Sequence, residues 1–109
     1  VRMGWSMTPG PERPLPGISV DAVRWMHARG VSVYAGDIGD AVPPLDPAMP
    51  APLHLAGLHA LGLPLVDSAK VDELAAVCAE LSRHSFLFVA APPRIHGLTG
   101  IPVNPVAIF

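Results

Sequence analysis

The chain has 109 residues, with 7 Lys and Arg, 9 Asp and Glu and 5 His, which gives a formal net charge of −2. Half of the residues are hydrophobic, 15% are charged, and there are 14 Pro and 10 Gly. This length allows one domain, seven basic residues exclude a dominant nucleic-acid-binding face, and no apolar run reaches the ~18 residues of a membrane span.

The N-terminal stretch predicts a strand end followed by a loop. Residues 1–5 (V-R-M-G-W) are typical of the end of a strand, and the segment at residues 8–17 contains four prolines and two glycines. Because proline removes a backbone donor and fixes φ, this segment is neither helix nor strand. A plain loop is the favoured interpretation, and a proline-rich ligand for an SH3 or WW domain is the alternative.

A helix and a strand are expected next. Ser19 is placed as an N-cap, residues 20–29 have helix-forming composition, and Gly30 stands where a glycine commonly ends a helix. Val23 and Met26 share one face of this helix, which we expect to pack in the core. Residues 31–35 (V-S-V-Y-A) alternate and predict a strand.

A second loop and a histidine-bearing helix follow. Residues 37–50 contain three Asp and four Pro, a pattern of ordinary turns rather than of a calcium loop, although ligation by these carboxylates is an alternative. Residues 52–61 predict a short helix closed by Gly62. Its two histidines, His54 and His59, would lie about 140° apart on an α-helix, which disfavours binding of one metal by both.

The last third predicts a helix between apolar extended segments. Residues 63–66 form a short apolar run, and residues 70–83 predict a helix with Cys78 in its apolar stripe, so Cys78 is interpreted as a buried structural thiol. As the only cysteine, it excludes an internal disulfide and favours a reducing, cytoplasmic setting. Residues 85–91 predict a strand buried on both faces, and residues 103–108 predict a final strand.

One pair of residues suggests metal chemistry. His54 and Asp67 bracket a helix, a glycine turn and a short extended run, and imidazole with carboxylate suits Zn²⁺ or Mn²⁺. Two ligands are fewer than the three protein ligands of a catalytic zinc. By spacing alone, a structural role for His54 is therefore the favoured interpretation.

The order of the segments resembles the second half of a known family. The segments that carry the resemblance are V-R-W-M-H-A-R-G-V-S-V-Y-A-G-D, P-L-H-L-A-G-L-H-A-L-G-L-P-L-V-D, V-D-E-L-A-A-V-C-A-E-L, F-L-F-V-A-A-P and the tail R-I-H-G-L-T-G-I-P-V-N-P-V-A-I-F. Together they resemble the cyclase family of metal-dependent hydrolases, which includes bacterial kynurenine formamidase and isatin hydrolase. The resemblance covers nearly the whole chain.

The resemblance implies an α/β fold that is part of a swivelling β/β/α domain, with a mixed sheet and two to three helices. It also implies hydrolysis of a C–N bond, in a small amide or formamide, by water bound to zinc or manganese. His54 matches the family's histidine ligand, and Asp67 stands where the family usually has a glutamate ligand. No residue of this chain is assigned a catalytic role.

Besides Asp67, the sequence departs from the family pattern at several other places. The family's main metal motif, H-x-G-T-H-x-D, is absent, Leu98 replaces a usual glycine and Ile101 replaces a usual serine. Leu98 is expected to strain a tight glycine turn. We therefore expect residues 1–109 to form one partial domain, weakly active or inactive alone, that associates as a homodimer. The alternative is a non-catalytic structural or interaction module that has lost its metal site.

Overall fold

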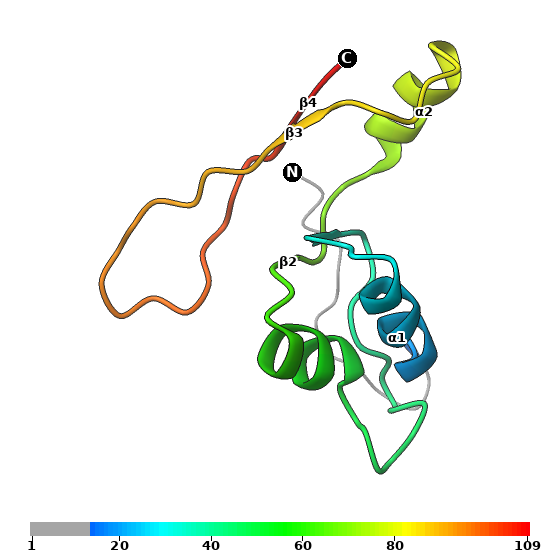
Figure 1. Cartoon of the computed structure of the whole chain (residues 1–109), viewed down its shortest axis with the longest axis vertical. Coiled ribbons are helices and arrows are strands. Elements are labelled where there is room, and N and C mark those ends of the chain that lie inside the picture. Colours follow the sequence, from blue (N-terminus) through cyan, green and yellow to red (C-terminus); the bar gives the residue numbers. More distant parts are fainter. Residues whose placement is uncertain (1–13) are drawn as a thin grey trace. The chain divides into compact units, whose positions relative to one another are not determined.

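The computed structural model describes residues 14–109, so the strand expected at residues 1–5 lies outside the described part. The elements in chain order are α1 (Val20–Ala28), β1 (Tyr34–Ala35), η1 (Leu53–Ala60), β2 (Leu65–Val66), α2 (Asp72–Glu80), β3 (Leu87–Val89) and β4 (Val106–Ile108). Figure 1 labels α1, β2, α2, β3 and β4. The described residues thus form a small mixed α/β protein with three helices and small sheets, which confirms the expected class. Contacts divide the chain into two compact units, Val1–Ala69 and Lys70–Phe109.

Helix α1 begins and ends as its sequence predicts. The hydroxyl of Ser19 accepts a hydrogen bond from the backbone N–H of Ala22 at 3.2 Å, which satisfies one of the free donors at the helix start. At the other end, Gly30 has φ +65°, a left-handed conformation that glycine adopts without steric cost. Both caps are therefore confirmed.

Helix η1 is a π-helix, which the sequence did not distinguish from an α-helix. Its hydrogen bonds join residues five apart, so such residues lie above one another along the helix axis. The expected separation of about 140° between His54 and His59 assumed α-helical geometry, which η1 does not have. Gly62 follows the helix with φ +69°, as expected for the glycine that closes it.

The core of the first unit lies where α1 meets η1. Val23 and Met26 of α1 are buried, as predicted, and pack with Leu53 and Leu63. Leu53 has no exposed surface. The start of η1 is therefore fixed to the core by the residue immediately before His54.

A short parallel pairing of β1 with β2 places the residues that follow β2 in the first unit. β1 pairs with β2 in the register Tyr34 with Leu65 and Ala35 with Val66. The N–H of Gly36 donates to the carbonyl of Val66 at 3.1 Å, which extends this ladder toward Asp67. The strands are shorter than the predicted runs at residues 31–35 and 63–66.

The second unit contains α2 and an antiparallel ribbon of β3 and β4. A long connection runs from β3 to β4 (Figure 1). Cys78 is buried on α2, as expected. The prediction that residues 85–91 are buried on both faces is wrong, because Leu87 is 62% exposed and Val89 is 41% exposed. Each strand of a two-stranded ribbon has one neighbouring strand. Apolar side chains on such a strand therefore stay exposed unless another element covers them.

The turn near the C-terminus also differs from expectation. Gly97 takes the left-handed conformation with φ +81°, whereas Leu98 is not among the described residues with positive φ. The expected strain at Leu98 is therefore absent. Within residues 14–109, none of the helices has the length and apolar character needed to cross a bilayer.

Candidate metal-binding site

The two residues expected as metal ligands lie side by side in the first unit. His54 is the second residue of η1, and Asp67 directly follows β2. The Nε2 atom of His54 is 3.3 Å from the Oδ2 atom of Asp67. Both side chains are partly exposed, at 46% for His54 and 40% for Asp67, so this pair is open to solvent.

A third residue, Asp40, completes the cluster on the opposite side of the imidazole ring. Its Oδ2 atom lies 2.6 Å from Nδ1 of His54, a short hydrogen-bond distance. The Asp40 side chain is 13% exposed, far less than that of Asp67. The more buried carboxylate, Asp40, thus contacts Nδ1, and the more exposed one, Asp67, lies beside Nε2.

The position of Asp40 is fixed by two backbone segments. The N–H of Leu15 donates to the carbonyl of Val42 at 2.7 Å, and the N–H of Ile18 donates to the carbonyl of Gly39 at 2.8 Å. In turn, Oδ1 of Asp40 accepts a hydrogen bond from the N–H of Leu53 at 2.7 Å. This carboxylate caps the first turn of η1, where Pro52 supplies no side-chain hydrogen bond.

The separation of His54 and Asp67 fits one edge of a metal coordination shell. Ligand atoms at the ordinary zinc bond lengths of ~2.0–2.2 Å and a tetrahedral angle are ~3.4 Å apart, close to the 3.3 Å between Nε2 and Oδ2. An imidazole nitrogen and a carboxylate oxygen also suit Zn²⁺ or Mn²⁺. The donor pair therefore fits two positions around such an ion.

The cluster as a whole does not form a closed metal site. Asp40 and Asp67 contact different nitrogens of one ring, so the three side chains do not converge on one point. Among residues 14–109, no group of three or more His, Cys, Asp or Glu side chains is arranged to hold a metal ion. His59 is exposed on η1 and does not belong to the cluster.

Tyr34 lies near the same cluster, and its surroundings shift its pKa. Its hydroxyl donates to the carbonyl of Ile38 at 2.7 Å. Burial raises the pKa of Tyr34 above its ordinary value, and the negative charges of Asp37 and Asp67 raise it further. Both causes act in the same direction, because the phenolate is poorly solvated there and repelled by carboxylates.

This shift predicts a measurable titration. Tyr34 is the only tyrosine of the chain, so phenolate absorbance in the near ultraviolet reports on it alone. We expect its midpoint to lie at higher pH in the folded chain than in denaturant, and to move down in Asp67→Asn. Since the folded pKa is raised, the contribution to stability is present below about pH 10 and is lost as the pH rises through the folded pKa. Equal midpoints in folded and unfolded chain would contradict this account.

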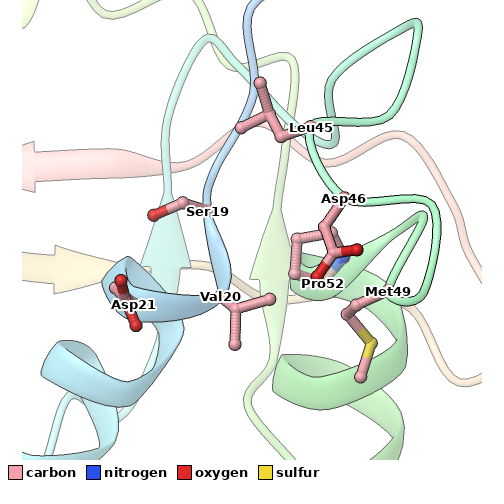
Figure 2. Close-up of a pocket in the computed structure, with 7 residues that line it drawn as sticks. All are labelled: Ser19, Val20, Asp21, Leu45, Asp46, Met49 and Pro52. Carbon is pink, nitrogen blue, oxygen red and sulfur yellow. The ribbon is translucent and has the colours of Figure 1, made fainter.

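A separate hollow of about 200 Å³ lies between the start of α1 and the loop before η1. Figure 2 shows its lining, which includes the Asp21 and Asp46 side chains and the apolar Leu45 and Met49. Asp46 also accepts a hydrogen bond from the N–H of Ala48, as turn-forming aspartates do. The hollow shares no lining residue with the Asp40, His54 and Asp67 cluster.

The sequence identified His54 and Asp67 but missed Asp40. The loop at residues 37–50 favours ordinary turn chemistry for Asp40, with ligation as the alternative, and nothing in its spacing from His54 indicates contact. Comparison of the chain with family models, with curated proteins and with solved structures finds no match. The family resemblance therefore rests on the sequence segments that carry it.

Proposed function

We propose that this chain supplies part of a divalent metal site in a hydrolase of C–N bonds, similar to the arylformamidase-like members of the cyclase family. The observation that carries the proposal is the placement of His54 Nε2 beside Asp67 Oδ2 at 3.3 Å, with Asp40 on the other ring nitrogen. His54 and Asp67 would hold zinc or manganese. When bound in a full ligand set, such an ion activates water and polarises an amide carbonyl.

The chain's own residues have narrower tasks in this proposal. Asp67 provides a partly exposed carboxylate. His54 provides its Nε2 atom, while Nδ1 of the same ring contacts Asp40. Aspartate is one methylene shorter than the glutamate that the resemblance places here, yet β2 brings its carboxylate within reach of the imidazole. Further ligands and the groups that move protons would come from residues outside residues 1–109. The small substrate would be an amide or formamide.

Metal binding by the purified chain tests the proposal. We expect weak uptake of Zn²⁺ or Mn²⁺ in titration calorimetry, since two protein ligands are available, and loss of this uptake in His54→Ala. His59→Ala is the matched control, because His59 lies on the same helix but outside the cluster, and it should bind as the unmodified chain does. An unmodified chain that binds neither ion, or a His54→Ala variant that binds as well, would refute the metal site.

The second candidate is a non-catalytic interaction module, and the exposed apolar ribbon favours it. Large apolar side chains on and between β3 and β4 are exposed, namely Leu87, Val89, Ile95, Leu98, Val106 and Ile108. Among residues 14–109, β3 and β4 pair only with each other, and sheet edges with free backbone groups invite association. We propose self-association, with a dimer as the smallest form, under either function. Absence of metal uptake together with a stable dimer would favour the module.

A further inference from the structure

The contacts of Asp40 assign it a task that goes beyond capping a helix. Its two oxygens divide their partners: Oδ1 accepts from the N–H of Leu53 at 2.7 Å, and Oδ2 lies 2.6 Å from Nδ1 of His54. Oδ2 also lies 3.4 Å from the backbone N of His54, at the long end of hydrogen bonding. One carboxylate therefore binds both the backbone and the ring of the same helical turn.

The chemistry of the two groups decides which ring nitrogen carries the proton. An ionised carboxylate only accepts hydrogen bonds, and a neutral imidazole has one N–H donor and one bare nitrogen. In a neutral ring, the 2.6 Å contact with Asp40 favours the hydrogen on Nδ1, because it is shorter than the 3.3 Å contact of Asp67 with Nε2. The lone pair is then on Nε2, the nitrogen beside Asp67.

We propose that Asp40 is a positioning residue that holds His54 in the Nδ1–H tautomer and fixes its ring, so that the Nε2 lone pair faces a divalent cation beside Asp67. The inference rests on the proposed function for the cation, but the tautomer itself can be measured without metal. Carboxylates that receive the second N–H of a metal-binding histidine act in this way in general. The low exposure of Asp40 agrees with a supporting role, because both of its carboxylate oxygens already contact Leu53 and His54.

Asp40→Asn separates positioning from helix capping. Asparagine has nearly the same size and keeps an oxygen that accepts from the N–H of Leu53. Its amide N–H group then faces Nδ1 and donates to it, which favours hydrogen on Nε2, the wrong tautomer for a ligand. A residue that merely caps η1 would tolerate this change.

The experiment is ¹⁵N-edited NMR of the imidazole rings in the metal-free chain at alkaline pH, where imidazoles in general are neutral. His54→Ala identifies the His54 signals. We expect the Nδ1–H tautomer in the unmodified chain and a shift toward Nε2–H in Asp40→Asn. Calorimetry with Zn²⁺ alone should show affinity ~10–100-fold lower in Asp40→Asn. Asp46→Asn is the matched control, since Asp46 caps a turn of the same loop without contacting a histidine.

The outcomes distinguish this inference from the proposed function. Hydrogen on Nε2 in the unmodified chain would overturn the role of Asp40, and this reading needs no variant to fold. Equal Zn²⁺ affinity and tautomer in the unmodified chain and Asp40→Asn would also overturn it. If the tautomer changes as expected but the unmodified chain binds no metal, the proposed function fails while the orientation of His54 by Asp40 stands.

Discussion

Leu53→Ala is expected to lower the free energy of unfolding by about 2–5 kcal/mol, the range for leucine truncation in a packed core. Leu53 has no exposed surface and packs with Val23, Met26 and Leu63. The loss within this range depends on how far the neighbouring side chains move into the space that leucine leaves. Urea denaturation followed by circular dichroism measures the loss.

Leu55→Ala is the matched control for this experiment. Leu55 lies on the same helix, has the same side chain and is 45% exposed. Truncation there removes less buried surface and leaves no cavity, so we expect a loss of less than about 1 kcal/mol. Similar losses in the two variants would mean that α1 and η1 do not pack around Leu53 in solution.

Gly17→Ala is expected to displace the segment that holds Asp40, and with it the orientation of His54. A Cβ atom at residue 17 would overlap the backbone nitrogen of Ala41 and lie 2.5 Å from the carbonyl carbon of Asp40. These are backbone atoms, so relief requires the two chain segments to separate. Overpacking of this kind costs about 1–3 kcal/mol, and the hydrogen bond from Ile18 to Gly39 should be lost.

Two readings follow the effect of Gly17→Ala: the denaturation midpoint and the imidazole spectrum of His54. We expect the midpoint to fall and the Nδ1–H tautomer to lose its preference, although residue 17 contacts neither His54 nor Asp67. Gly39→Ala is the control, because a Cβ there would meet only Oδ2 of Asp67 at an ordinary 3.8 Å. If Gly39→Ala and Gly17→Ala behave alike, close packing of residues 17 and 41 does not position Asp40.

Local signals predicted the elements that depend on neighbouring residues. The start of α1 follows from Ser19, and its end follows from Gly30, whose positive φ is confirmed. The buried face of α1 follows from the spacing of Val23 and Met26. Each of these features is decided within about one helical turn, so periodicity and capping chemistry suffice.

Features that depend on distant contacts were not predicted. Asp40 reaches His54 across fourteen positions in the sequence. Its place is set by backbone hydrogen bonds that Leu15 and Ile18 donate to the neighbouring residues Val42 and Gly39, which no side-chain pattern encodes. The amino-acid composition of η1 is also typical of an α-helix, so it does not indicate π-helical hydrogen bonding. The run at residues 85–91 is apolar enough for a buried strand, but burial depends on what covers the strand, which composition does not state.

The contacts of His54 with Asp40 and Asp67 also close loops in the chain. The three residues lie at the two ends and near the middle of a segment that runs from residue 40 to residue 67. Closing such a loop costs conformational entropy that grows only slowly with its length. An ion held between His54 and Asp67 would bind the folded chain in preference to the unfolded chain and so stabilise it. If the proposed ion binds, metal binding and folding of this unit would then be one coupled equilibrium, and the ion would add to the stability of a small core.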